Sequence, residues 1–200
     1  MTVLYEPDLV TAATVFPVSV AEAKKQCQVT HNDDDAYLQQ LIEAASDQAQ
    51  SDIPGGISLL TSTYDYFLPC FHSDFITLPR PPLQSVTTVK YYDSNNTLQT
   101  LATSGYYVRT YERKPGVVYT AKNTIWPTTE PDRIDAVQIR YVAGWTLAAS
   151  VPKRIKHAVL MLVSHWHANR EPVIVGTSSG TLPHGYRDLV MGAGYGAGYF

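Results

Sequence analysis

The sequence predicts an α+β protein in which an antiparallel β-domain is inserted into a small helical bundle. Two stretches with helical periodicity, near 33–52 and 152–170, flank a block, 57–145, that is rich in β-branched and aromatic residues. Each helix has one apolar stripe to bury, so we expect the two to pack together with the β-domain outside that pairing. The expected domains are a discontinuous helical core (1–56 and 146–191), the β-domain (57–145) and a flexible tail (192–200).

The N-terminal part of the chain is expected to hold two helices after an irregular lead-in. Residues 1–16 have no clean periodicity. Ser19 and Glu22 have the spacing of a capping box, which starts a helix that we expect to run to about Gln28. The helix near 33–52 follows, with acidic residues at its positive end and a stripe made of Leu38, Leu41, Ile42, Ala45 and Ala49.

The block 57–145 has the composition of antiparallel β-structure. Runs of β-branched and aromatic residues are separated by turn segments such as PRPPL, DSNNT and KPG, and we expect six or seven short strands. In two of these runs apolar residues alternate along the chain: Tyr64, Tyr66 and Leu68 in the first, and Val137, Ile139 and Tyr141 in the second.

The stretch near 152–170 predicts the central helix of the protein. Pro152 suits the first helical position, and Pro172 ends the pattern. Its apolar stripe consists of Ile155, Ala158, Val159, Leu162, Val163 and Trp166, which we expect to be buried. Leu160 and Met161 lie outside the stripe and suggest a second apolar face, which a neighbouring subunit would cover.

The C-terminal part is expected to contain a short amphipathic turn, HGYRDLVM, and then the tail GAGYGAGYF. The tail cannot build a core, so we expect it to be disordered in the free subunit. It carries three large aromatic side chains and no charge, which favours docking on a partner through Tyr195, Tyr199 and Phe200.

The composition excludes several classes of protein. The formal net charge is −3 and only 16% of the residues are charged, which argues against a nucleic-acid binder driven by overall charge. Cys27 lies in a predicted helix and Cys70 beside a proline in a turn, so the positions do not favour a disulfide. The sequence has neither a signal peptide nor a long apolar run, and we expect a soluble protein made in a reducing cytoplasm.

The sequence predicts no catalytic, cofactor or metal site. His157, His165 and His167 lie on the central helix, but their spacings of eight and two residues do not match the i, i+4 pair that places two imidazoles on one metal. No Gly-x-Ser-x-Gly nucleophile motif is present, and no Gly-rich phosphate loop follows a strand. We therefore expect a protein that is not an enzyme.

Two features suggest binding surfaces. Lys153, Arg154 and Lys156 crowd the first turn of the central helix, where positive charge is unfavourable. Either nearby carboxylates of the same chain balance them, or they contact an acidic partner surface or the DNA backbone. The many tyrosines of the β-block are typical strand residues, and they could also form a face that stacks on sugar rings.

Several segments, taken together and in order, resemble the head–tail connector, or adaptor, family of tailed-phage necks, which also occurs in phage-derived gene transfer particles. They run from about Pro17 to Val190 and are PVSVAEAKKQ, DDDAYLQQLIEAA, LPRPPLQSVTTVKYYD, AGW, VPKRIKHAVLMLVSHWHANRE and LPHGYRDLV. The resemblance implies a helical core with a variable β-insert. It also implies assembly as a ring, typically twelve-fold, that extends the DNA channel below the portal.

The resemblance defines the expected partners and location. The partners are the portal protein, a stopper or tail-terminator protein, and further copies of the chain, while genomic DNA only passes through the channel and no membrane is involved. The expected location is the neck of the virion, after assembly in the host cytoplasm. Lys153, Arg154, Lys156, Tyr195, Tyr199 and Phe200 are the candidate residues for binding the portal or a neighbouring subunit. The alternatives are a carbohydrate-binding or other surface-binding module, which would use the Tyr-rich β-domain, and a small hydrolase.

Overall fold

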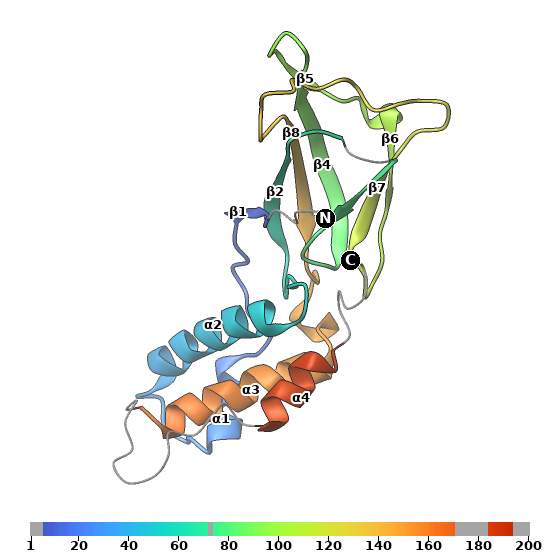
Figure 1. The fold of residues 1–200 in the computed structure, drawn as a ribbon. Helices are drawn as coiled ribbons and strands as arrows, with labels where there is room; N and C mark the ends of the chain where they lie inside the picture. The colour runs from blue at the N-terminus through green and yellow to red at the C-terminus, as the bar shows by residue number, and fades with distance from the viewer. Residues whose placement is uncertain (1–5, 72–73, 171–183, 194–200) are drawn as a thin grey trace.

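The computed structural model describes residues 6–71, 74–170 and 184–193. Figure 1 shows an elongated molecule with the helices packed together at one end and the β-strands at the other. The described residues form four α-helices and two antiparallel sheets. The α+β class predicted from the sequence, a helical bundle with an inserted antiparallel β-region, is confirmed.

The helices lie close to the positions that the sequence predicts. They are α1 (Val20–Cys27), α2 (Asp35–Asp52), α3 (Lys153–Ala168) and α4 (His184–Met191). Both halves of the capping box at α1 are present, since the Glu22 backbone N–H donates to the Ser19 side chain and the Ser19 backbone N–H donates to the Glu22 carboxylate. The segment expected to be a short turn near the C-terminus is the eight-residue helix α4.

The helices bury a single apolar core, with α3 at its centre. The two long helices α2 and α3 pack against each other, as the matched stripes predict, and α1 and α4 also contact α3. Leu38, Ile42, Leu162 and Val163 all belong to this core and are fully buried. The packing of the two helices predicted from the sequence is therefore confirmed.

The strands form a five-stranded sheet and a three-stranded sheet, with a second apolar core. The larger sheet has the order β1-β2-β8-β4-β5 and the smaller sheet the order β3-β7-β6. Their bounds are β1 (Asp8–Thr11), β2 (Ser62–Leu68), β3 (Phe75–Leu78), β4 (Leu83–Tyr92), β5 (Leu98–Thr100), β6 (Tyr106–Arg109), β7 (Gly116–Thr120) and β8 (Val137–Ala143). Seven of these strands lie in the block 57–145, in agreement with the six or seven expected.

The expectation of an irregular lead-in is wrong for part of residues 1–16. Asp8–Thr11 forms β1, which pairs antiparallel with β2 at the edge of the larger sheet. All four of its residues are exposed, so no alternation between a buried and an exposed face marks the strand in the sequence. Its backbone pairing with β2, rather than burial of its side chains, holds it in place.

One expectation for α3 needs correction. Trp166, expected as the last buried member of the stripe, is only half-buried, because it lies in the final turn of α3 at the margin of the core. The second apolar face, with Leu160 and Met161, is partly covered by the chain itself. Helix α4 packs on α3, and Gly185 lies so close to Met161 that a β-carbon at this glycine would be 3.2 Å from the methionine methyl group.

The helical core extends into the segments that enter and leave the β-region. Ile57, Leu59, Leu60 and Trp145 are buried in it. Gly144, in the AGW segment, adopts a φ of +101°, and a β-carbon there would lie 2.2 Å from the Leu60 carbonyl oxygen. Only glycine allows this close approach. The chain passes twice between the two cores, once near Leu60 and once near Trp145, and these two chain crossings therefore lie side by side.

Candidate functional site: the assembly surfaces

The basic first turn of α3 combines two exposed side chains with one that is paired. Lys153 and Arg154 are exposed. The Lys156 ammonium lies 3.2 Å from a carboxylate oxygen of Glu22 on α1. Arg154 donates a hydrogen bond to the Gly192 carbonyl just beyond α4. The structure thus brings the three predicted residues to one end of α3 but gives them different contacts.

The capping box of α1 also neutralises part of this turn. The pKa of Glu22 is lowered, first because the Ser19 backbone N–H donates to its carboxylate and further because Lys156 lies beside it. The anion is therefore held in place to balance Lys156. Lys153, by contrast, has no hydrogen-bond or ion-pair partner among the described residues. Its ammonium group is therefore available to a partner.

An exposed apolar side chain lies shortly before Lys153 in the chain. Leu147, six residues before it in the chain, is 63% exposed. A single 3₁₀ turn, Ala148–Ser150, separates Leu147 from the start of α3. We refer to Leu147, Lys153 and Arg154 as the α3 knob. In Figure 1 the turn between β8 and α3, which carries the knob, lies on the opposite side of the molecule from β1.

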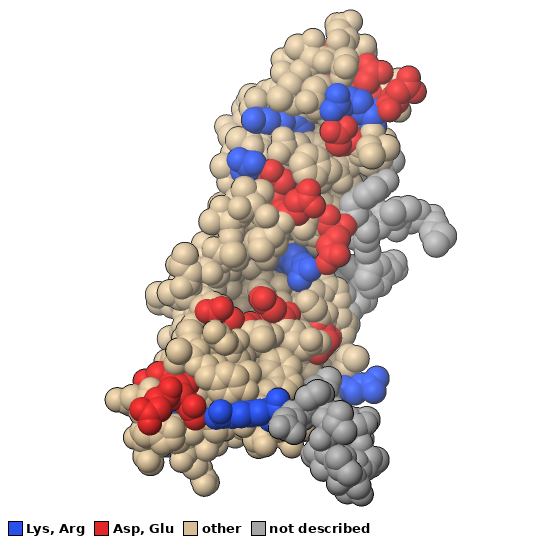
Figure 2. Space-filling view, turned by 90° about the vertical axis from the view of Figure 1, so that its left-hand side faces the viewer, with Lys and Arg blue, Asp and Glu red and all other residues tan. Residues whose placement is uncertain are grey.

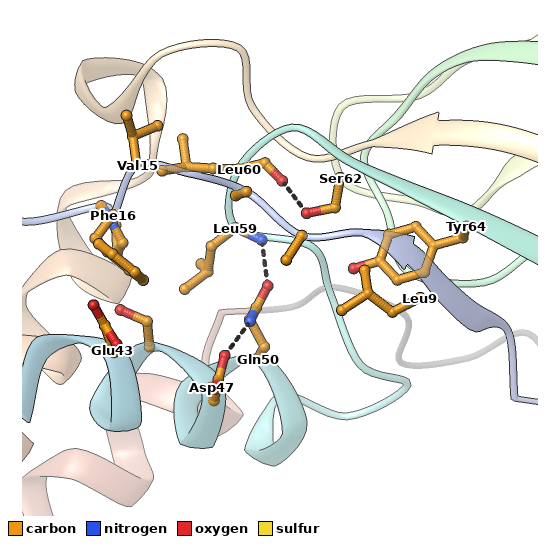
Figure 3. Close-up of a pocket in the computed structure, with 14 residues that line it drawn as sticks. Leu9, Val15, Phe16, Glu43, Asp47, Gln50, Leu59, Leu60, Ser62 and Tyr64 are labelled. Carbon is orange, nitrogen blue, oxygen red and sulfur yellow. Dashed lines mark hydrogen bonds between the residues drawn. The ribbon is translucent and has the colours of Figure 1, made fainter. Parts of the chain in front are cut away.

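A groove of about 210 Å³ lies on that other side, where the lead-in segment, α2 and the start of β2 meet. Figure 3 shows the lead-in residues Val15 and Phe16 above it and Glu43, Asp47 and Gln50 of α2 below it. Apolar side chains make most of its wall, and Leu9 and Val15 are each 56% exposed. We call this the junction groove.

Hydrogen bonds fix the polar side of the junction groove. The side-chain carbonyl oxygen of Gln50 accepts a hydrogen bond from the Leu59 backbone N–H at 3.0 Å. The side-chain amide nitrogen of Gln50 donates a hydrogen bond to the Asp47 carboxylate at 3.3 Å (Figure 3). The Glu43 and Asp47 carboxylates are exposed, and no basic residue of the described chain pairs with them. Figure 2 shows this side of the molecule, with acidic side chains across its middle. The groove is therefore apolar inside with an acidic rim.

No periodic pattern in the sequence marks the junction groove. Its upper wall is built by residues 12–17, which have no periodicity, and the strand β1 beside it carries no burial pattern. The one available signal was Glu43 and Asp47, two carboxylates four residues apart on the predicted helix near 33–52. This spacing places like charges next to each other on one face of a helix, which costs some tenths of a kcal/mol in an isolated helix.

The outer face of the smaller sheet forms an aromatic surface. The register places Phe75 opposite Tyr119 and Tyr119 opposite Tyr107, so three rings form one row across β3, β7 and β6. Phe75 and Tyr107 are 50% and 61% exposed. Arg109 lies over the ring of Tyr111, 5.1 Å from its centroid, at the side of this row. Other tyrosines of the β-region, Tyr64, Tyr66, Tyr106 and Tyr141, are buried in its core.

The three histidines of α3 point to different surroundings. The His167 ring lies 3.6 Å from Asp34 and 6.2 Å from the ring centroid of Tyr37. His157 is exposed and His165 is half-buried. Within the described ranges, no group of three or more His, Cys, Asp or Glu side chains could hold a metal ion. Cys27 and Cys70 are half-buried thiols, and burial raises the pKa of Cys27.

The remaining candidate residues, Tyr195, Tyr199 and Phe200, lie outside the described residues. None of the helices in the described part of the chain is long and apolar enough to cross a membrane.

The fold and these surfaces define a structural protein with several exposed faces suited to assembly. The profile of the head completion protein family matches residues 18–178, and the chain belongs to this family. The match covers α1 to α3 and strands β2 to β8, while β1 and α4 lie outside it. The resemblance to the proteins of phage necks inferred from sequence segments is thereby confirmed. No curated protein sequence matches the chain.

Solved structures share the whole fold at low sequence identity. A chain in the neck of an empty gene transfer agent (GTA) particle, determined with C6 symmetry, superposes with a TM-score of 0.77 at 19% identity over 98% of both chains. A chain in the native GTA virion gives 0.76 at 19% identity, again over 98% of both chains. A chain in the native GTA neck, determined with C12 symmetry, gives 0.67 at 17% identity over 98% of both chains.

Proposed function

We propose that the protein is a structural component of the neck of a phage or phage-derived particle, where it completes the DNA-filled head and enables tail joining. The observation that carries this proposal is family membership over both the helical core and the β-region. The likeness to neck chains over 98% of the length supports it. Family membership also supports a structural role rather than an enzymatic one.

Deletion of the gene tests the proposed function. Particles made without the protein are expected to accumulate as heads that have packaged DNA but carry no tail, and wild-type protein supplied in trans should restore joining. Negative-stain microscopy of the products and immunogold labelling of complete particles measure both points. Normal tailed particles from the deletion strain, or label away from the neck, would contradict the proposal.

We further infer that the protein acts as a ring between the portal and a stopper or tail-terminator protein. The related neck structures have C6 and C12 symmetry, which supports a ring of six-fold or twelve-fold order. The low net charge of −3 suits a channel that passes DNA without holding it, since basic linings bind phosphates strongly. A reconstruction of the particle neck without imposed symmetry would measure the number of copies and identify the proteins above and below.

The tail 192–200 is proposed as a docking segment of this ring. Its residues Tyr195, Tyr199 and Phe200 would bind an exposed strand edge or pocket of the portal or of a neighbouring copy. Truncation after Ala193 keeps the Gly192 carbonyl that binds Arg154 and should leave the melting temperature within about 4 °C, a shift of roughly 1 kcal/mol or less. The same truncation should abolish joining of heads to tails. Wild-type joining by the truncated protein would leave the tail with no role in assembly.

The aromatic row of the smaller sheet supports a second candidate function, binding of carbohydrate at the particle surface. Phe75, Tyr107 and Tyr119 offer ring faces of the kind that stack on sugars, and Arg109 lies beside them. Binding of the purified protein to a glycan array, with the Tyr107→Ala variant as the control, would test this function. Glycan binding that disappears in the variant supports this function, and no binding leaves the surface to protein contacts.

A further inference from the structure

We propose that the α3 knob of one subunit docks into the junction groove of the next copy of the chain, and that this contact repeats around the ring. The inference rests on the proposed neck function and deepens it by naming the two surfaces that meet. It requires that the surfaces differ from each other and face opposite ways, because a closed ring uses head-to-tail contacts. In Figure 1 the turn between β8 and α3, which carries the knob, lies across the molecule from β1, and Leu9 of β1 lines the groove.

The apolar parts of the two surfaces are complementary. The groove offers about 210 Å³ between the lead-in, α2 and β2. For comparison, an apolar cavity of about 150 Å³ in another protein binds a benzene molecule, so the groove can accept one large aliphatic side chain. Leu147 is the exposed apolar side chain of the knob, and Leu9 and Val15 are the exposed apolar side chains of the groove. Contact between them would remove all three from water.

The charges of the two surfaces are also complementary, and each is unfavourable in the single subunit. Glu43 and Asp47 repel each other across one turn of α2. Lys153 lies at the positive end of α3, where the aligned peptide dipoles oppose a cation. Neither set finds a balancing partner in the described part of the chain. Lys153 placed between the two carboxylates of the next copy would relieve both costs at once.

Contacts within the subunit leave Lys153 as the basic residue that contacts the next copy of the chain. Lys156 is held by Glu22, and Arg154 is held by the Gly192 carbonyl, so both of these shape the knob within its own subunit. The bond from Arg154 also ties the end of α4 to the start of α3. The knob is thus presented on a surface braced by α1 and α4, which reduces the entropy lost on docking.

A charge-swap experiment in assembling particles tests the electrostatic part. Lys153→Glu and Asp47→Lys should each reduce the amount of protein in purified particles by about tenfold, since like charges in an interface cost more than 1.4 kcal/mol. The double variant should restore part of it, because the pair with residue 47 is recreated with reversed sign while Glu43 keeps its negative charge. Lys122→Glu and Asp132→Lys change exposed charges of the β-region and should have no effect. Absence of rescue in the double variant would overturn the proposed pairing.

Cross-linking of the complete particle tests the geometry. A chain that carries both Leu147→Cys and Val15→Cys should, after oxidation, give a ladder of covalent oligomers up to the full ring. Either substitution alone should give no ladder, because the two surfaces belong to different copies. A dimer from Leu147→Cys alone would indicate a symmetric contact, and a bond from Val15→Cys to another protein would identify a different occupant. Both results would overturn the inference.

The two failures can be told apart. If the doubly substituted protein is present in the neck but forms no ladder, the knob-in-groove contact is wrong and the neck function stands. If the wild-type protein is absent from purified particles, the neck function fails and the contact inferred from it fails too. Thermal melting of each variant as the free subunit, expected to match wild type because the altered side chains are exposed, excludes misfolding as the cause.

Discussion

The ion pair between Asp65 and Arg140 shows how one residue fixes the register of the central strands. The two lie opposite each other on β2 and β8, and the guanidinium donates to both carboxylate oxygens, at 2.8 and 2.6 Å. Gln138 donates a third hydrogen bond. Asp65 is buried, and the hydrogen bonds from Arg140 hold its pKa below the usual value for an aspartate. A slip of β8 by one residue would break all of these contacts.

Asp65→Asn is expected to lower the free energy of unfolding by about 1–2 kcal/mol at neutral pH. Hydrogen bonds to charged groups contribute about 1.5–3 kcal/mol, and Arg140 is 41% exposed, so solvent screens part of this pair. Chemical denaturation measures the loss, with Asp132→Asn on an exposed loop as the control. A difference equal to that of the control would mean that the pair contributes nothing.

The same contact predicts a dependence on pH. The pKa of Asp65 is lower in the folded protein than in the unfolded chain, so the carboxylate stabilises the fold at pH values above about 4. This stabilisation is lost as the pH falls through the lowered pKa of the folded state. Denaturation of wild type and Asp65→Asn between pH 7 and pH 2 should therefore converge at the acid end. A constant difference over this range would contradict the assignment.

The half-buried position of Trp166 changes what its removal should cost. Truncation of a fully buried Trp to alanine lowers the free energy of unfolding by about 3–5 kcal/mol. Because Trp166 lies at the margin of the core, only part of its ring leaves water on folding. Trp166→Ala is therefore expected to lower the free energy of unfolding by about 1.5–3 kcal/mol. Leu162→Ala, at the centre of the same stripe, should cost about 2–5 kcal/mol and serves as the buried comparison. A larger loss at Trp166 than at Leu162 would contradict this order.

At the scale of the element, a buried tyrosine of α4 forms a hydrogen bond with α2. Tyr186 is buried, and its hydroxyl donates to the Asp52 carboxylate at 2.7 Å. Burial, together with this hydrogen bond, raises the pKa of Tyr186. Because the raised pKa belongs to the folded state, the stability that the neutral hydroxyl contributes is present below about pH 10 and is lost as the pH rises further.

Tyr186→Phe is expected to cost about 1–2 kcal/mol and to loosen α4 before the rest of the helical core. The ring remains to fill its site, so the loss is that of one hydrogen bond to a charged group. Limited proteolysis should cut the variant near 184–193 faster than wild type, while Tyr107→Phe, whose ring is 61% exposed, should behave as wild type. Equal cleavage rates for wild type and Tyr186→Phe would show that the bond does not hold α4.

The elements differ in how well the sequence predicts them, and the reason is burial. Helices α1, α2 and α3 each bury an apolar stripe or carry a capping box, so their periodicity and bounds could be read within two residues or so. The strand β1 buries no side chain, and its pairing comes from β2, more than fifty residues later in the chain. A contact of that kind leaves no local pattern, and the groove beside β1 was missed with it.

At the scale of the whole molecule, the two cores meet where the chain crosses twice between them. Leu60 and Trp145 form a parallel bridge, and the Thr61 backbone N–H donates to the Trp145 carbonyl at 3.2 Å. Next to this point β2 begins and β8 ends, with Ser62 opposite Ala143. The ends of the β-region thus lie next to each other. A segment whose ends lie together can be removed without stretching the remaining chain.

The division into domains is a prediction that excision can test. Deletion of residues 62–143, with Thr61 joined to Gly144 through two glycines, should leave a helical protein that folds and melts cooperatively, because every residue of its core is retained. Deletion of 57–145, the boundaries expected from the sequence, is the matched comparison. It also removes Ile57, Leu59, Leu60 and Trp145, whose loss should leave large cavities and cost well over 5 kcal/mol.

Circular dichroism and thermal melting of the two deletions would separate three outcomes. A cooperative melt for the shorter deletion alone would show that the helical core folds by itself and includes both chain crossings. Cooperative melting of both deletions would place the domain boundary at 57 and 145, outside the crossings. A non-cooperative melt for both would mean that the β-region is needed for the helices to fold. We expect the first outcome, since the four residues at the crossings pack on the helices and not in the core of the β-region.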